Sequence, residues 1–572
     1  MKNNALVADY FIKIAELLEI KGDNPFRIRA YMKAAETIGN LSEDLKSYVQ
    51  QGRLEDLAGI GHDLAEKIKE IVLTGKCEFY NELKRSIPEG VLEILEIPSV
   101  GPKTARLFFE KLNIKSLDEL KKAASDGRLM SLPGVKEKTI DNILKGIALI
   151  KKGKQYLDLL TADAVSSQIC SALKKGNLAD KLVVAGSFRR MKESVRDIDI
   201  LAVSGKPEAI IDAFVHLPCV KRVLVKGDLK STVLTQDDAQ VDLRVFQSNS
   251  FGAALLYFTG SKDHNIHLRQ LAMKKGLKIN EYGVFDKKNR CLGSKCEADL
   301  YKALGLDFIE PELREDTGEI EAAAQGKLPR LIKLSDIRGD FHVHTNYSDG
   351  IETVEDMVDE ARCYPYDYVC LSDHSVSLKI AGGLDKEALK KKKRQIDRIN
   401  ARLKNFKVLF GTEVEIDVDG RIDYDEDILS DFDIVIAAIH TGFKQSKKQL
   451  TKRVIRACQN KHVHIIAHPT GRLWPARGPY ELDFKEIFKV AKDTNTAFEI
   501  NAHPYRLDLT DQNARWAKEN GVKLSINTDS HNRSHLGYMR FGVGIARRAW
   551  LEKGDVLNTL TLKELFKAIQ KK

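Results

Sequence analysis

DFHVHTNYSDG, residues 340–350, opens the pattern that decides the fold of the last part of the chain. Six later apolar runs end in polar residues in the same way: DYVCLSDH (367–374), KVLFGTEVE (407–415), DIVIAAIH (433–440), VHIIAHP (463–469), AFEINAHP (497–504) and VKLSINTDSH (522–531). Helical segments such as VEDMVDEARC separate most of these runs. Repeated strand–helix units are typical of parallel strands that close into a barrel. We therefore predict a distorted (β/α)7 barrel over residues 336–572.

Nine side chains at or just after the ends of these runs are candidate metal ligands: His342, His344, Asp349, His374, Glu413, His440, His468, Asp529 and His531. Strand ends of a barrel meet at one mouth, so we expect these side chains to lie together. Mixed imidazole and carboxylate ligands suit Zn²⁺, Mn²⁺ or Fe better than Mg²⁺. Nine ligands are too many for one ion and predict two or three, an arrangement that can activate water and hold a phosphoryl group.

Composition limits the classes of protein that the chain can represent. Its 572 residues allow about three or four domains, and 43% hydrophobic and 30% charged residues are ordinary for a globular protein. No apolar run is long enough to span a bilayer, and eight scattered cysteines form no disulfide framework, so we expect a cytosolic protein without a membrane partner. The net charge of +10 is too mild to establish nucleic-acid binding by itself.

A second candidate site is acidic and lies upstream, in GSFRRMKESVRDIDIL (186–201) and QVDLRVF (240–246). Asp197 and Asp199 are two residues apart and would share one face of a strand, and Asp242 lies on another strand. Three carboxylates without a nearby histidine suit Mg²⁺, which prefers oxygen ligands and substrate phosphates. The preceding turn at Gly186 places a serine and two arginines where a triphosphate could bind.

The first 154 residues read as helices with a repeated glycine turn: LAGIGHDLAEKI (57–68), IPSVGPKTARLF (97–108) and SLPGVKEKTIDNI (131–143). Such turns expose backbone N–H groups at a helix start, which suits a phosphate. The candidate DNA-backbone contacts are Gly59, Gly61, Gly101 and Lys103. The third copy has one glycine and is the weakest. The alternative for any single copy is a tight helical hairpin without a ligand.

The acidic motifs stand in a recognisable order with YFTGSKDHNIHLR (257–269) and GLKINEYG (276–283). Together they resemble family X DNA polymerases of the DNA polymerase beta kind, over about residues 1–318. The resemblance implies an α+β nucleotidyltransferase core in which the three aspartates bind two catalytic ions, Mg²⁺ or Mn²⁺. It also implies that Ser187 and Arg190 contact the triphosphate, beside the small turn at Gly186. Tyr257, Phe258 and Gly260 would form the turn beside the incoming sugar, Asn265 would contact a base edge and Arg269 would contact the template.

The chain departs from this family pattern at several positions. Lys262 stands where the beta enzyme has an acid, and Arg196 replaces a glycine just before the first aspartate. Lys67 matches the lysine that forms a Schiff base with a 5′-deoxyribose phosphate. Asp63, however, replaces a second pocket lysine, so the sequence leaves the lyase activity open.

Residues 336–572 resemble the polymerase-and-histidinol-phosphatase (PHP) superfamily, which matches at all nine candidate ligands. The resemblance implies that Glu413 bridges metals and that the cluster hydrolyses phosphoesters. Asp349 stands where some relatives have histidine. A family X core joined to a PHP domain resembles bacterial PolX-type repair polymerases, in which the PHP domain is a Mn²⁺-dependent 3′–5′ exonuclease that cleans 3′ ends and sometimes cleaves abasic sites.

We predict five segments: an N-terminal helical 8-kDa-like domain with a helix-hairpin-helix (1–90), a second, thumb-like helix-hairpin-helix region (91–154), a nucleotidyltransferase palm with its nucleotide-binding subdomain (155–318), a linker (319–335) and the PHP domain (336–572). The predicted enzyme fills short gaps in base excision repair, trims 3′ ends, binds gapped or primer-template DNA and dNTP, and acts as a monomer in the bacterial cytosol or nucleoid. The alternatives are a PHP domain that acts as a small-molecule phosphatase of the histidinol-phosphatase type, and a non-catalytic DNA-end scaffold.

Overall fold

The computed structural model describes residues 2–571, apart from 40, 42–44, 58, 96, 98–99, 134, 136–138, 141–142, 145–146 and 148–155. Part of the third glycine turn, SLPGVKEKTIDNI, including its Gly134, lies outside the described residues. The chain forms two compact units, Met1–Lys154 and Gln155–Lys572. None of the described helices has both the length and the apolar character that crossing a membrane requires.

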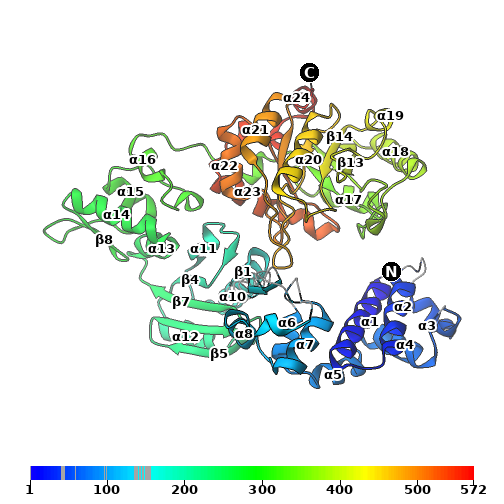
Figure 1. Ribbon diagram of the computed structural model, residues 1–572. Helices are drawn as coiled ribbons and strands as arrows, with labels where there is room; N and C mark the ends of the chain where they lie inside the picture. The colour runs from blue at the N-terminus through cyan, green and yellow to red at the C-terminus, as the bar shows by residue number, and fades with distance from the viewer. Residues whose placement is uncertain are drawn as a thin grey trace. The chain divides into compact units, whose positions relative to one another are not determined.

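The first unit is helical (Figure 1, blue to cyan). Its helices are α1 (Lys2–Lys21), α2 (Pro25–Gly39), α3 (Leu45–Gln51), α4 (His62–Thr74), α5 (Glu78–Arg85), α6 (Glu89–Leu95), α7 (Pro102–Leu112) and α8 (Leu117–Ser125). Buried residues form two clusters, one from Val7 to Val91 and one from Ile94 to Ile147. The predicted helix-hairpin-helix turns precede α4 and α7, whose N-caps are Gly61 and Gly101.

The second unit begins with a five-stranded sheet in the order β2 (Lys181–Val184), β4 (Ile198–Val203), β7 (Gln240–Phe246), β6 (Lys230–Thr235) and β5 (Val220–Lys226). Only the β4–β7 pair is parallel. The short strands β1 (Leu157–Asp158) and β3 (Ser194–Val195) pair beside it. Its helices are α10 (Leu159–Lys175), α11 (Gly186–Arg189) and α12 (Pro207–Val215). This sheet is the predicted α+β core.

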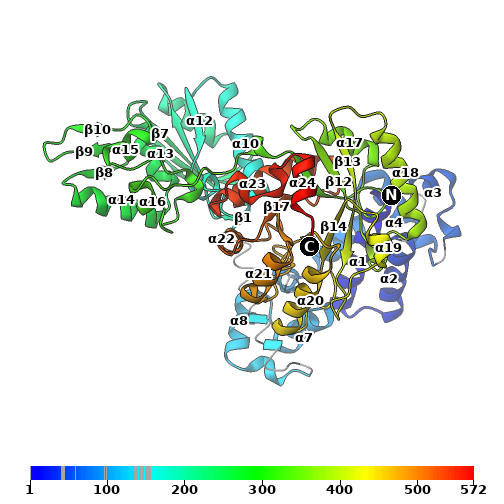
Figure 2. The same cartoon turned by 90° about the horizontal axis from the view of Figure 1, so that it is seen from above.

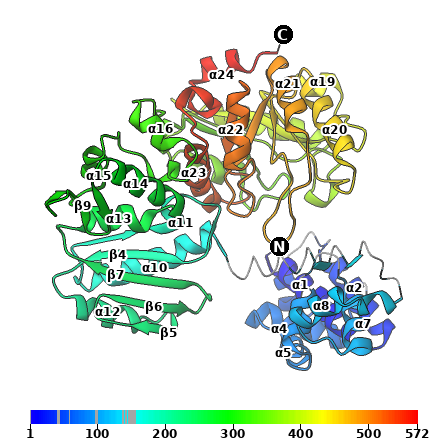
Figure 3. The same ribbon diagram turned by 60° about the vertical axis from the view of Figure 1, so that its left-hand side comes forward.

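A smaller group of helices and strands comes after this sheet in the chain (Figure 3). It contains α13 (Phe251–Thr259), α14 (Lys262–Lys274), β8 (Lys278–Asn280), β9 (Gly283–Phe285), β10 (Cys291–Gly293) and α15 (Glu297–Ala303). The three strands form an antiparallel sheet in the order β10–β9–β8. Within the predicted linker the chain forms α16 (Glu319–Ala324). The five predicted domain boundaries stay predictions.

The remaining chain forms a parallel sheet whose strands keep their sequence order: β11 (Gly339–Val343), β12 (Tyr368–Leu371), β13 (Lys407–Glu415), β14 (Ile434–Ala438), β15 (Ile465–Ile466), β16 (Ala497–Asn501) and β17 (Leu524–Asn527). All seven predicted strands are present. A parallel bridge joins Val343 to Ser530, and the His344 amide donates to the Ser530 carbonyl at 2.8 Å, so the first and last strands nearly close a barrel. The predicted (β/α)7 architecture is confirmed.

Helices lie outside these strands, as Figure 2 shows around β12, β13, β14 and β17. They are α17 (Val354–Ala361), α18 (Lys386–Asn400), α19 (Glu426–Leu429), α20 (Lys447–Gln459), α21 (Phe484–Asp493), α22 (Asp511–Glu519), α23 (Met539–Arg548) and α24 (Leu562–Ala568). The strands are buried along most of their length because both faces are covered, one by helices and one by the barrel interior. The carboxyl ends of the strands therefore form a single open mouth where polar side chains can gather.

Candidate metal centres

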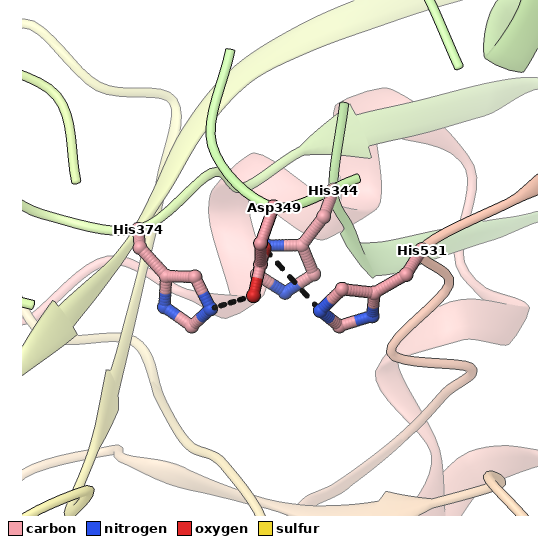
Figure 4. Close-up of side chains that lie close together, drawn as sticks. All are labelled: His344, Asp349, His374 and His531. Atoms are coloured by element: carbon pink, nitrogen blue, oxygen red, sulfur yellow. Dashed lines mark ion pairs between the residues drawn. The ribbon is translucent and has the colours of Figure 1, made fainter. Parts of the chain in front are cut away.

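All nine predicted ligands meet at the mouth of the barrel. They form four overlapping groups in which the ligand atoms lie within 4.8 Å of one another: His344, Asp349, His374 and His531; His342, Glu413 and His468; His342, His344 and Asp529; and His374, Glu413 and His440. Figure 4 shows the first group, with Asp349 between His374 and His531. Asp349 oxygens lie 3.4 Å from Nε2 of each of these two histidines. Overlapping groups favour more than one ion.

Glu413 lies at the centre of the cluster. One of its oxygens lies 2.9 Å from His468 Nε2 and 3.3 Å from His440 Nε2, and the other lies 2.9 Å from His374 Nδ1. Burial alone would raise the pKa of this carboxyl, but the surrounding histidines hold it well below its usual range. A carboxylate that faces different ligands with its two oxygens can bridge two ions, which is the role that the resemblance implies.

The histidines of the cluster differ in protonation. Burial would lower the pKa of His374, but the Glu413 and Asp349 carboxylates raise it to about 10, so a bound dication would take the place of its proton. Burial, together with His531 and His374, lowers the pKa of His344 to about 4, so this imidazole is neutral at pH 7 and can act as a ligand. Among the described residues, several buried ligand atoms have no hydrogen-bond partner: His342 Nε2, His344 Nδ1 and Nε2, His468 Nδ1 and Glu413 Oε2. Buried polar atoms without partners are costly, and metal coordination would satisfy them.

Two carboxylates that the sequence interpretation missed orient the ligands. Glu499 accepts hydrogen bonds at 2.8 Å from His342 Nδ1 and at 2.7 Å from the His468 amide. Glu415 lies 2.8 Å from His440 Nδ1. A hydrogen bond to the second ring nitrogen fixes the orientation and tautomer of a ligating histidine. The available signal was an acidic residue inside each apolar run, AFEIN and TEVE.

Lys392 is a buried lysine of the barrel domain. It lies in the KKKKR run at 390–394, which its composition predicts to be a solvated helix face, but the Lys392 side chain is fully buried. The lysine Nζ lies 2.9 Å from Asp373 Oδ2 and donates to the Leu371 and Gly411 carbonyls. Asp373 in turn accepts hydrogen bonds from Thr345, next to His344. The prediction that this run is a solvated helix face was therefore wrong for Lys392, because this lysine is buried and pairs with Asp373.

We expect Lys392→Met to destabilise the protein by about 3–5 kcal/mol, because it leaves the buried Asp373 carboxylate without its cation. Thermal unfolding followed by circular dichroism would measure the effect. Lys391→Met is the matched control, since Lys391 is exposed on the same helix. Equal unfolding midpoints for the two variants would contradict the structural role of Lys392.

The acidic site lies on the parallel pair β4 and β7, where Asp199 is the register partner of Asp242. Asp197 lies two residues before Asp199 and just ahead of β4. Burial and the carboxylates of Asp197 and Asp242 raise the pKa of Asp199 to about 7. Asp242 Oδ1 is buried without a hydrogen-bond partner among the described residues. Mutual repulsion and an unpaired acceptor fit a divalent ion, although these three carboxylates are more widely spaced than the four groups at the barrel mouth.

The turn before these aspartates requires glycine. Gly186 has a φ of +64°, and a Cβ there would lie 2.6 Å from Asp199 Oδ2. A side chain would therefore displace a candidate ligand. The turn continues as α11, which carries Ser187, and ends at Arg190.

Arg190 is held on two sides. Its Nε donates to Glu315 Oε1 at 3.0 Å and its Nη1 donates to the Thr259 carbonyl. A Cβ on the adjacent Gly260 would lie 3.0 Å from Arg190 Nη1, so the predicted sugar-side turn and the predicted triphosphate contact are neighbours. Tyr257 and Phe258 precede this turn on α13, and Tyr257 is 38% exposed, so it is not a core residue.

Asn265 and Arg269 lie on α14. The Asn265 side chain donates to the Tyr257 carbonyl at 2.7 Å, and Arg269 Nε donates to the Asn265 carbonyl at 3.2 Å. The same helix therefore carries both predicted nucleic-acid contacts. Their roles stay predictions.

In the first unit, Lys67 lies on α4, after the glycine turn of Gly59 and Gly61. Its Nζ lies 2.5 Å from Asp63 Oδ1 and 5.0 Å from the centre of the Phe79 ring. Asp63, the residue that departs from the family pattern, is thus the direct partner of Lys67. Lys103 lies in the first turn of α7, after Gly101.

Comparisons with known proteins agree with this architecture. Family models match four segments: "Helix-hairpin-helix domain" at 2–77, "SAM-like Helix-hairpin-helix tandem" at 91–148, "DNA polymerase beta thumb" at 254–315 and "PHP domain" at 340–503. DNA polymerase lambda of Rattus norvegicus is 26% identical over 53% of this chain and 54% of its own length. A "Probable phosphatase" of Thermoanaerobacter sp. (strain X514) is 28% identical over 38% of this chain and 89% of its own length.

A full-length relative is the "DNA polymerase/3'-5' exonuclease PolX" of Bacillus subtilis (strain 168), which is 37% identical over 555 residues. The match covers 96% of each of the two proteins, and so includes both the acidic site and the histidine-rich cluster. This chain therefore belongs to the bacterial PolX family.

Proposed function

We propose that this chain extends DNA 3′ ends at Asp197, Asp199 and Asp242 and hydrolyses DNA 3′ ends at the nine-residue cluster of the barrel. The observation that carries the proposal is the presence, in one compact unit, of two separate ligand sets with unpaired buried acceptors. The printed name of the Bacillus subtilis relative contains the same two activities.

In the polymerase reaction, the chain positions the nucleotide and takes up a proton. Asp242 Oδ1, the unpaired buried oxygen, accepts the proton of the primer 3′-hydroxyl as the 3′ oxygen attacks the α-phosphorus. The bond from the α-phosphorus to its bridging oxygen breaks, and pyrophosphate leaves. Ser187 and Arg190 bind the triphosphate. Bound Mg²⁺ or Mn²⁺ would make the hydroxyl more acidic and neutralise the phosphates.

For the exonuclease reaction, the histidines and carboxylates of the barrel mouth would hold two or three ions, Mn²⁺, Zn²⁺ or Fe. These ions would supply an activated water and charge neutralisation for the phosphodiester. Glu499 and Glu415 keep the imidazoles of His342 and His440 oriented. Attack by water breaks the bond between the phosphorus and the 3′ oxygen of the preceding nucleotide, so the DNA strand loses one nucleotide as a 5′-mononucleotide.

The substrates that fit these sites are gapped or primer-template DNA and dNTP, and the proposed role is short-gap filling and 3′-end cleaning in base excision repair. The helix-hairpin-helix turns of the first unit would contact the DNA backbone. We propose that the protein acts as a monomer in the bacterial cytosol or nucleoid. A lyase role for Lys67 stays a prediction that borohydride trapping on a 5′-deoxyribose phosphate would test.

A labelled one-nucleotide gap tests the proposal. With Mg²⁺ and dNTP the primer should lengthen by one nucleotide, and with Mn²⁺ and no dNTP it should shorten. The phosphatase relative gives an alternative for the barrel, a small-molecule phosphatase. Hydrolysis of p-nitrophenyl or histidinol phosphate without any DNA shortening would support that alternative, and no reaction with any substrate would support a DNA-end scaffold.

The raised pKa of Asp199 makes a separate prediction for the metal-free protein. A carboxyl whose pKa rises from about 3.9 in the unfolded chain to about 7 in the folded one destabilises the fold increasingly as pH rises between those values. In EDTA, Asp199→Asn should therefore raise the thermal unfolding midpoint more at pH 8 than at pH 5. At pH 8 we expect the free energy of unfolding to rise by on the order of 1–3 kcal/mol. The same gain at both pH values would contradict the prediction.

A further inference from the structure

One face of α23 in the barrel domain is packed on the nucleotidyltransferase core (Figure 3). The residues that make the contact are spaced four, three and one apart and so share one side of the helix: Arg540, Gly544, Arg547 and Arg548. Arg540 forms a two-bond ion pair with Asp163 on α10, and Arg547 forms one with Glu312. These two pairs attach α23 to parts of the core that carry no candidate active-site residue.

Arg548 is different because it contacts the nucleotide turn itself. Its side chain is only 4% exposed. The Arg548 Nη1 donates to the Arg190 carbonyl at 2.9 Å and to Glu315 Oε1 at 2.8 Å. Asp511, on α22, accepts from its Nε and Nη2 at 2.9 and 2.7 Å and holds the other edge of the guanidinium. A planar guanidinium held at both edges is fixed in orientation.

The same Glu315 oxygen also accepts from Arg190 Nε, at 3.0 Å. Burial would raise the pKa of Glu315, but Arg190 and Arg548 outweigh it and lower that pKa, so the carboxylate is charged and holds both arginines. With Nε bonded to Glu315 and Nη1 to Thr259, the Nη2 of Arg190 has no acceptor among the described residues. That nitrogen is the donor left for a phosphate oxygen.

A second contact holds the turn independently of these charges. A Cβ at Gly544 would lie 2.7 Å from Met191 Cγ, and Met191 directly follows Arg190. The close approach of α23 thus depends on glycine at this position. Helix α23 therefore contacts the turn of Ser187 and Arg190 at two points. One is the side chain of Met191, and the other is the backbone carbonyl of Arg190.

We propose that Arg548 of the barrel domain is a positioning residue for the polymerase reaction, and that it acts through Glu315 and the Arg190 carbonyl to aim Arg190 at the incoming triphosphate. The inference rests on the proposed function, since it assumes that Arg190 binds dNTP. It means that the hydrolytic domain completes the nucleotide site of the core. The loss of Arg548 should weaken dNTP binding more than it slows the chemical step, because the three aspartates do not contact it.

Steady-state incorporation into a one-nucleotide gap tests this inference with the full chain. We expect Arg548→Ala to raise KM for dNTP about tenfold, the size of effect that losing charge-assisted hydrogen bonds produces, and to change kcat less than about twofold. Glu315→Gln should act in the same direction, since it weakens the same link from the core side. Arg540→Ala is the matched control, because it breaks an arginine–carboxylate pair of the same helix away from the nucleotide turn, and its KM should stay within about twofold of wild type.

Two further measurements separate positioning from general damage. The exonuclease rate of Arg548→Ala should equal that of wild type, because Arg548 contacts none of the nine candidate metal ligands. In the double variant Arg190→Ala/Arg548→Ala, KM should equal that of Arg190→Ala alone, because Arg548 acts through Arg190. An unchanged KM in Arg548→Ala, an equal rise in Arg540→Ala, a parallel loss of exonuclease activity, or additive effects in the double variant would overturn the inference. Failure of the wild-type chain to incorporate dNTP would instead refute the proposed function.

Discussion

Asp242→Ala is expected to reduce nucleotide incorporation by about a thousandfold or more, because the loss of metal binding and proton acceptance removes several kcal/mol of transition-state stabilisation. The 3′–5′ degradation of the same labelled primer should continue at the wild-type rate, because no barrel residue depends on Asp242. Primer extension with Mg²⁺ and dNTP, and degradation with Mn²⁺ alone, measure the two activities.

Asp237→Ala is a suitable control for this experiment, since Asp237 is an exposed acid in the turn between β6 and β7. It should leave both activities unchanged. If Asp242→Ala removed both activities and Asp237→Ala neither, the division into two sites would be wrong.

Glu413→Gln is expected to have the opposite effect, with exonuclease activity reduced by about a thousandfold or more and incorporation preserved. The amide keeps the size of the side chain but removes the charge that faces His374, His440 and His468. We expect the purified variant to contain less bound metal, which elemental analysis measures independently of activity. His344→Ala should give the same pattern.

Glu486→Gln, an exposed glutamate on α21, is the control for metal content and activity. Wild-type degradation by Glu413→Gln would show that this carboxylate is not part of the hydrolytic centre.

The sequence predicted the parts of the fold that local patterns determine. The seven strands were visible because each is an apolar run with a polar end, and the nine candidate ligands were visible because each lies at or just after the end of such a run. The acidic site was visible because Asp197 and Asp199 lie two apart beside a glycine turn. In each case, the residues that carry the signal are close together in sequence.

Long-range partners were not predictable in this way. Lys392 looks like its exposed neighbours, and only the fold places it under Asp373. Glu499 lies 157 residues from His342, whose imidazole it orients. Arg548 lies 358 residues from Arg190, and nothing in RRAW distinguishes it from the adjacent Arg547. Such contacts depend on tertiary packing, so the sequence alone does not show which residues become partners, even where an acidic residue inside an apolar run marks one of them.

The near-closure of the barrel between β11 and β17 has a consequence for biosynthesis. The histidine-rich cluster draws His342 and His344 from its first strand and Asp529 and His531 from just after its last, so a ribosome must add almost 190 further residues before the two ends can meet. Synthesis proceeds from the N-terminus. The three candidate polymerase aspartates therefore leave the ribosome long before the histidine-rich cluster can assemble, and a chain that ends before Asp529 would lack part of the proposed hydrolytic centre.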